Sequence, residues 1–343
     1  MISKGIMWFA PTFSLLHGYF FMVSSAQGIQ SDAKNRSEVD RKLDRSFIWT
    51  TRIFAFAIAI TLLWIGIQVG IQAIPAFKEF GFGFLFTTEW SPNPPRVSLG
   101  ILPSIYGTLA SSFIGLLIAV PIGIGTAILL SESILPVSLR TILVFLVELL
   151  AAIPSVVYGL WGIFVLIPFL GNIGKWLSEY LGWLPIFSVP QSGSINGPGL
   201  LPAGIILAIM TLPIITAISR DALASVPRSL REAAYGLGCT RWETLLRVII
   251  PAAFSGIVSA VMLALGRAIG ETMAVTMLIG NSNRISPSLF APSNTIASLL
   301  ANQFPEASGL QVSALMYAAF VLFILTLVVN ILAELIVLRV KRL

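Results

Sequence analysis

Six long apolar stretches alternate with polar segments along this chain, and they constrain its fold more than any other feature. A helix rises 1.5 Å per residue, so about 20 apolar residues cross the hydrocarbon core of a bilayer. The composition agrees with membrane insertion, because the 343 residues are 56% hydrophobic and only 10% charged. The sequence therefore predicts an all-α polytopic membrane protein with six transmembrane helices. We place these helices at about residues 48–74, 104–130, 141–169, 200–218, 256–280 and 312–338.

The charged residues predict how these helices are oriented. Basic residues gather at 34–52, at 220–247 and at the C-terminal end, each beside an apolar stretch. In three other loops the charges sum to zero, namely 75–103, 171–199 and 281–311. Cytoplasmic loops of membrane proteins carry an excess of Lys and Arg, so both termini are expected in the cytoplasm. The net charge of +6 follows from this distribution and does not indicate nucleic-acid binding.

The N-terminal region is expected to be separate from the six-span domain at 47–343. Residues 6–23 are apolar and are followed by small residues, as in a signal peptide, but cleavage there would leave the basic 34–52 segment outside. We interpret residues 1–46 as an extension followed by a charged cytoplasmic lead-in. Residues 1–30 are expected to be dispensable, with Met22 as an alternative start, and an interfacial helix is the second interpretation. His17 is given no functional role.

A long polar segment, residues 220–251, separates two apolar stretches and predicts two short helices. Pro227 suits the first turn of a helix, and Gly236 and Gly238 suit its end. Thr240 and Glu243 have the spacing of a capping box that starts the next helix. The first helix carries an apolar stripe of Leu230, Ala233, Ala234 and Leu237. The segment is therefore expected to present a short basic helix to a soluble partner.

Part of this segment resembles the EAA loop of ABC importer permeases. The matching residues are Glu232, Ala233, Ala234, Gly238, Val248, Ile250 and Pro251. Val248 and Ile250 are conservative departures from the Ile and Leu of the family pattern. The resemblance implies a MetI-like permease fold in which this loop is the coupling helix that docks into a cleft on the ATP-hydrolysing subunit. Glu232, Ala233, Ala234 and Gly238 are the implied coupling residues. The alternative is an ordinary amphipathic loop.

Three ionisable residues fall inside the predicted spans: Glu148, Arg267 and Glu271. A charge at membrane depth costs about 3 kcal/mol on insertion scales, so such residues pair or line a polar path. Arg267 lies about eleven residues, or about 16 Å, beyond Gly256 and is expected near the bilayer midplane. Arg267 and Glu271 are four residues apart, which predicts one helix face and a possible ion pair.

This pair has two interpretations. It could be a structural bridge that locks helices together, or Arg267 could attract anions on a translocation path. A guanidinium group suits tetrahedral oxyanions because its fork matches two oxygens and it stays charged. Glu148 is interpreted as a structural partner. A proline at position 154 predicts a kink in the third span.

Residues 264–275, ALGRAIGETMAV, are similar to the PstC-type permease subunits of phosphate importers. The similarity extends from about residue 45 to the end and includes 102–108, 153–159, 212–216 and 294–298. It implies that Arg267 and Glu271 take part in phosphate passage. It also implies a PstA-type sister permease, two ATP-binding subunits and a periplasmic or extracellular phosphate-binding protein. The implied location is the bacterial cytoplasmic (inner) membrane, in contact with membrane lipid.

The sequence lacks the G-x-x-x-x-G-K-[ST] pattern of a P-loop, since Gly171 and Lys175 have the wrong spacing. We therefore expect no enzyme activity in this chain and no cofactor, with ATP and Mg²⁺ bound by the partner subunits. One cysteine, Cys239, cannot form a disulfide or a metal cluster within the chain. Two alternatives stay open: a permease for another oxyanion such as sulfate or molybdate, and an anion transporter that needs no ATP.

Overall fold

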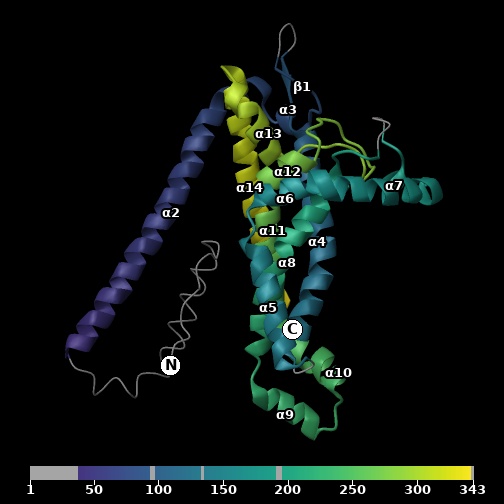
Figure 1. Ribbon diagram of the computed structural model, residues 1–343. Helices are drawn as coiled ribbons and strands as arrows, with labels where there is room; N and C mark the ends of the chain where they lie inside the picture. The colour runs from purple at the N-terminus through teal and green to yellow at the C-terminus, as the bar shows by residue number, and fades with distance from the viewer. Residues whose placement is uncertain (1–37, 93–96, 133–134, 191–194, 341–343) are drawn as a thin grey trace. The chain divides into compact units, whose positions relative to one another are not determined.

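The computed structural model describes residues 38–92, 97–132, 135–190 and 195–340 (Figure 1). The predictions for residues 1–30, including Met22 and His17, lie outside the described residues. The chain divides into two compact units, residues 1–71 and 72–343, and each is described by itself. The described part of the first unit is helical and belongs to α2 (Glu38–Phe80), which continues into the second unit.

The second unit is mostly helical with one small hairpin. Its strands β1 (Trp90–Ser91) and β2 (Ser98–Leu99) pair antiparallel, with Trp90 opposite Leu99. The first half contains α3 (Gly83–Phe86), α4 (Leu102–Ser131), α5 (Val137–Ala152), α6 (Ser155–Trp161), the π-helical turn η3 (Gly162–Leu166), α7 (Ile167–Leu181) and η4 (Pro185–Phe187). The second half contains α8 (Leu200–Ala224), α9 (Arg228–Gly236), α10 (Arg241–Thr244), η5 (Leu245–Ile249), α11 (Ile250–Gly270), α12 (Met273–Leu278), α13 (Ile296–Gln303), η6 (Phe304–Glu306) and α14 (Leu310–Val340).

The described residues include six helices long and apolar enough to cross a membrane, which confirms the predicted number. They are Lys42–Phe80, Leu102–Ser131, Ser155–Leu181, Leu200–Ala224, Arg241–Gly270 and Leu310–Leu335. The first, second, fourth and sixth of them overlap the predicted stretches closely, whereas the third and the fifth are shifted along the chain by 10 to 15 residues. The chain is a multi-pass membrane protein.

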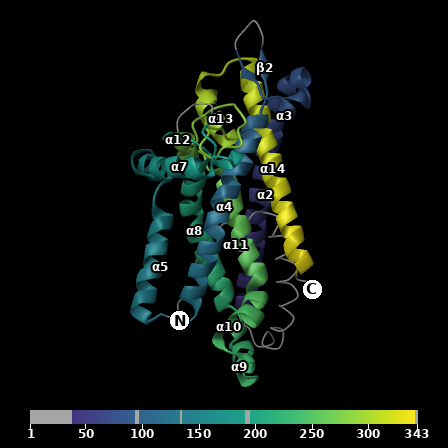
Figure 2. The same cartoon turned by 90° about the vertical axis from the view of Figure 1, so that its right-hand side faces the viewer.

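Helices α4, α8 and α11 form the centre of the second unit and run side by side (Figure 2). Small residues let α4 and α8 approach closely: a side chain at Gly115 would collide with Leu207, and one at Gly204 would collide with Ile114. The Thr216 hydroxyl of α8 donates to the Gly123 carbonyl of α4 at 3.3 Å. Without a hydrophobic driving force in lipid, such close packing and interhelical hydrogen bonds hold membrane helices together.

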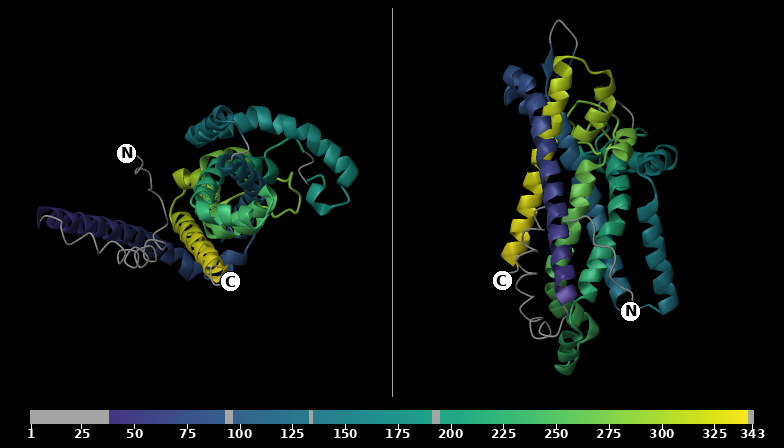
Figure 3. Two further views of the ribbon diagram at one scale, coloured as in Figure 1. Left: turned by 90° about the horizontal axis from the view of Figure 1, so that it is seen from below. Right: turned by 90° about the vertical axis from the view of Figure 1, so that its left-hand side faces the viewer.

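The third apolar stretch differs from the prediction of one kinked span at 141–169. Helix α5 runs alongside α8 and ends at Ala152, and the chain restarts as a helix at Ser155. Pro154 causes this full break, because it lacks an N–H and disfavours the helical conformation of Ile153. The second helix is continuous over Ser155–Leu181. It is long and apolar enough to cross a membrane, but its α7 part lies across the direction of α4 and α8 (Figures 1 and 3).

Candidate functional site

The fifth span is also broken, at the residues singled out in the sequence. One continuous helix, Arg241–Gly270, contains α10, η5 and α11, and it begins and ends earlier than the predicted span at 256–280. Glu271 has extended backbone, with φ −69° and ψ 122°, and the short helix α12 begins at Met273. Arg267 therefore lies in the last turn of α11. Because the helix begins at Arg241 and not at Gly256, the predicted depth of Arg267 in the membrane, which was counted from Gly256, does not hold.

Arg267 and Glu271 do not lie on one helix face, so the predicted pairing geometry is wrong. The i, i+4 neighbourhood requires a continuous helix, and the helix ends between the two residues. The Glu271 carboxylate instead accepts a hydrogen bond of 3.4 Å from the Ala274 N–H at the start of α12. Within the described residues no ion pair joins Arg267 to Glu271, and Arg267 is exposed on this chain.

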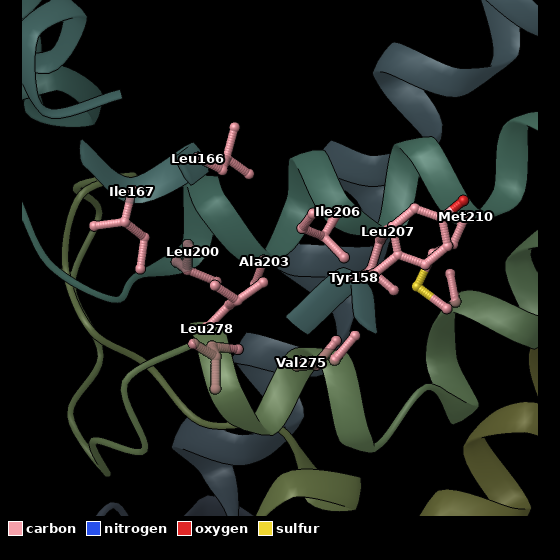
Figure 4. Close-up of a cluster of buried hydrophobic side chains, with 13 residues drawn as sticks. Tyr158, Leu166, Ile167, Leu200, Ala203, Ile206, Leu207, Met210, Val275 and Leu278 are labelled. Atoms are coloured by element: carbon pink, nitrogen blue, oxygen red, sulfur yellow. The ribbon is translucent and has the colours of Figure 1, made fainter. Parts of the chain in front are cut away.

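The two short helices that follow the breaks, α6 and α12, pack against each other. A side chain at Gly159 would collide with Met277, and one at Gly162 would collide with Leu278. Around them lies a buried apolar cluster that also includes residues of α8 (Figure 4). The Tyr158 hydroxyl donates to the Leu150 carbonyl at 2.8 Å, which satisfies a backbone group freed by the first break.

This arrangement places a charged residue beside two interrupted helices. Arg267 lies in the last turn of α11, just before the break at Glu271 and the start of α12. Interrupted helices occur at membrane depth where they are buried in protein or line a water-filled cavity, and they are common at substrate sites of transporters. An exposed guanidinium next to them could bind an oxyanion through two N–H groups. The described residues include no group of three or more His, Cys, Asp or Glu side chains that could hold a metal ion.

Glu148 is exposed on α5, and within the described part of the chain it makes no hydrogen bond or ion pair. Among the described residues, the interpretation of Glu148 as a structural partner therefore finds no partner group.

The first predicted short helix of the coupling segment forms as expected from its local signals, whereas the second one is wrong, because its residues begin the continuous helix Arg241–Gly270. Helix α9 covers residues 228–236 and ends in a Schellman motif. In this motif the Cys239 N–H donates to the Ala234 carbonyl at 3.1 Å, and the Gly238 N–H donates to Tyr235 at 2.9 Å. Gly238 has a φ of +84°. The capping box is also confirmed, with Thr240 and Glu243 bonded reciprocally through side chain and backbone.

The predicted apolar stripe of α9 lies mainly on the surface of this chain. Ala234 is buried, whereas Leu230 is exposed and Leu237 is 85% exposed. Glu232 and Ala233 are exposed as well. Helix α9 projects from the end of the second unit that lies opposite the β1–β2 hairpin (Figure 2). These apolar side chains of α9 are therefore accessible to another protein.

Arg231, also on α9, has a structural role that the sequence analysis missed. Its guanidinium donates to the Glu132 carboxylate at 2.5 Å and to the Leu223 carbonyl at 3.0 Å. Glu132 follows α4, and Leu223 belongs to the last turn of α8. Arg231 thus connects α9 to the ends of two spanning helices. Glu132 is 99 residues away in sequence, and no local pattern relates the two positions.

Comparison with known proteins gives close matches. Residues 119–342 match the family described as "Binding-protein-dependent transport system inner membrane component". The chain is 44% identical over 314 residues to the phosphate transport system permease protein PstC of Pasteurella multocida, covering 90% of this chain and 97% of that protein. It is 45% identical over 299 residues to the PstC protein of Mesorhizobium japonicum, covering 87% and 90% of the two chains.

Solved structures with a similar fold include a bacterial ABC transporter that imports the acidic polysaccharide alginate. The TM-score is 0.57 at 19% identity, with 88% of this chain and 99% of that chain covered. The MetNI methionine ABC transporter in an inward-facing conformation has a TM-score of 0.53 at 19% identity, with 70% and 95% covered. At this identity the likeness concerns the fold, which agrees with the expected MetI-like permease architecture.

Proposed function

Because this chain belongs to the family of binding-protein-dependent transport permeases, and within it to the PstC-type phosphate transport permeases, we propose that it is the permease subunit of an ATP-driven importer of inorganic phosphate. The observation that carries the proposal is the similarity over nearly the whole length of the phosphate permeases, 97% of the Pasteurella protein. The break after Arg267 supplies a site of suitable chemistry for an oxyanion.

In this proposal Arg267 attracts phosphate to the path between this chain and a sister permease. Its exposure leaves the guanidinium available to an ion or to the facing subunit. The Glu271 carboxylate lies at the start of α12, where it stabilises the helix N-terminus through Ala274. Its negative charge near the path would keep phosphate from being held too tightly by Arg267.

The coupling residues Glu232, Ala233, Ala234 and Gly238 belong to α9 and its C-terminal turn. We infer that α9 docks on one of two ATP-binding subunits, which hold ATP and Mg²⁺, while this chain has no nucleotide site. Closure of those subunits would push α9 as a rigid body, and Arg231 would carry the movement to α4 and α8.

The remaining partners are a PstA-type sister permease and a phosphate-binding protein on the outer side. The known alginate transporter supports such an assembly, since it was solved in complex with a pentasaccharide-bound periplasmic protein. We place the chain in the bacterial inner membrane with both termini in the cytoplasm, on the same side as α9.

The test is ATP-dependent uptake of labelled phosphate by the complete complex reconstituted into liposomes, with excess sulfate or molybdate as competitor. Arg267→Gln should reduce uptake at least tenfold, and Arg267→Lys should retain part of it because a positive charge remains. Arg140→Gln, which changes an exposed arginine at the beginning of α5, is the matched control.

If phosphate uptake were unchanged in the Arg267→Gln variant, Arg267 would have only a structural role. Equal competition by sulfate would remove phosphate as the specific substrate. Uptake without ATP, or a purified chain that never retains an ATPase subunit, would favour an ATP-independent transporter. All variants are compared at equal amounts of assembled complex, so that a loss of assembly is not mistaken for a loss of transport.

A further inference from the structure

Helix α7 has three distinct sides, although most of its residues belong to the segment 171–199 that was expected to be a loop. It is 15 residues long and lies across the spanning helices (Figures 1 and 3). The first side is buried: a side chain at Gly171 would collide with Asn196, and one at Gly174 would collide with Ile195 and Phe290. This side packs on the rest of the chain and holds α7 in its crosswise direction.

The second side of α7 is apolar, aromatic and exposed. Its members are Phe169, Ile173, Trp176 and Tyr180, which are 63%, 41%, 57% and 62% exposed. At 3.6 residues per turn these four positions fall within an arc of about 60°. The Trp176 and Tyr180 rings contact each other, with centroids 5.2 Å apart. Surfaces of soluble proteins that face water rarely expose four large apolar side chains side by side.

The third side of α7 is polar. Asn172, Lys175 and Glu179 are exposed, and their positions on the helix lie about 100° from the aromatic row. A helix with one apolar side, one polar side and a crosswise direction has the geometry of a helix lying in a membrane interface. Trp and Tyr are enriched at that level, because their rings are apolar and their N–H and O–H groups reach water.

Other exposed apolar side chains precede the aromatic row along the chain. The same helix begins at Ser155, and its earlier exposed residues Trp161, Phe164 and Val165 are apolar too. Helix α5, which precedes it, exposes Ile142 and Phe145. Exposed apolar side chains therefore occur both on α5 and along the helix that carries the aromatic row.

We propose that α7 is an interfacial anchor, whose aromatic row enters the boundary between lipid headgroups and acyl chains on the outer face of the membrane. The polar side then faces water. Because α6 and α7 belong to one continuous helix and α6 packs on α12, the anchor holds the outer ends of both interrupted spans at a constant depth. The proposal rests on the membrane location and on the orientation of the chain proposed above, and not on its substrate.

The experiment uses spin labels on the complete complex in bilayers of phosphatidylethanolamine and phosphatidylglycerol. The native cysteine is removed by Cys239→Ser, and single labels are placed by Ile173→Cys and Tyr180→Cys on the aromatic row. Asn172→Cys and Glu179→Cys, on the polar side, are matched controls on the same helix turns. Collision rates with oxygen, which concentrates in lipid, and with a nickel chelate, which stays in water, are then measured.

The ratio of oxygen to nickel collisions should be several-fold higher at positions 173 and 180 than at 172 and 179. Equal access of nickel to all four positions would overturn the proposal, because α7 would then lie in water. Exclusion of both reagents from 173 and 180 would also overturn it and would indicate a protein partner, such as the sister permease. All labelled variants lie at exposed positions, and retained phosphate uptake shows that they are folded.

A second measurement does not depend on labels. Lipids brominated near the headgroup boundary should quench less tryptophan fluorescence in Trp176→Phe than in the unmodified complex. An unchanged quenched fraction would contradict insertion of Trp176.

Discussion

At the scale of single residues, the backbone conformations of Gly238 and Gly236 show which of the two glycines is required at the end of α9. Gly238 has a φ of +84°, which costs an L-residue roughly 1–2 kcal/mol. Gly236 is the last residue of α9, has no positive φ and has open space around it. Only Gly238 is therefore required for the turn that ends the coupling helix.

We expect Gly238→Ala to lower the amount of phosphate transported per ATP hydrolysed, because the strained turn no longer holds α9 rigidly. Gly236→Ala should leave this ratio unchanged or raise it slightly, since alanine favours a helix. The measurement is uptake and ATP hydrolysis by the same liposomes. If both variants transported the same amount of phosphate per ATP hydrolysed, the turn at Gly238 would have no role in coupling.

Gly107 has a different role, in packing. A side chain there would meet the Asn294 carbonyl, whereas Gly125 in the same helix α4 has nothing within 4 Å. Overpacking of this kind costs typically about 1–3 kcal/mol. Gly107→Ala should lower the thermal unfolding temperature of the detergent-solubilised complex by several degrees, and Gly125→Ala should leave it unchanged. Similar unfolding temperatures for both variants would contradict the close approach.

At the scale of elements, Arg231 joins α9 to the ends of the spanning helices α4 and α8. The guanidinium and the Glu132 carboxylate are mostly buried, with side chains 20% and 16% exposed. Hydrogen bonds to charged groups contribute about 1.5–3 kcal/mol when both partners are present. The Leu223 carbonyl adds a favourable interaction of the cation with the C-terminus of α8.

Arg231→Gln is therefore expected to reduce transport several-fold while basal ATP hydrolysis continues. Arg228→Gln removes an exposed arginine from the same helix and is the matched control. A double-mutant cycle with Glu132→Gln separates the ion pair from other effects of each change. Additive losses would show that the two side chains do not act together.

At the scale of the whole molecule, the one cysteine reports the orientation of the chain. Cys239 is partly exposed in the turn after α9. A membrane-impermeant maleimide should label it in inverted vesicles and not in right-side-out vesicles. Ser282→Cys in a Cys239→Ser background, in the loop that follows α12, should give the opposite result. Labelling of Cys239 from outside would reverse the proposed orientation.

The sequence by itself determined the features that depend on local chemistry. The apolar stretches, the bounds of α9, its glycine turn and the capping box follow from residues within a few positions of each other. The position of Pro154 likewise predicted where the third stretch is interrupted, because a proline acts on its own turn of helix. The family resemblance in 264–275 agrees with the relatives found over nearly the full chain.

Only the tertiary structure decided how the interrupted helices are used. Nothing in the apolar run around Glu271 marks a helix end as clearly as a proline does, and the break there accompanies the packing of α12 on α6. The crosswise direction of α7 depends on contacts with residues 195, 196 and 290, and the Arg231–Glu132 pair joins positions 99 residues apart. Such long-range contacts carry no periodicity, so a reading of neighbouring residues cannot reveal them.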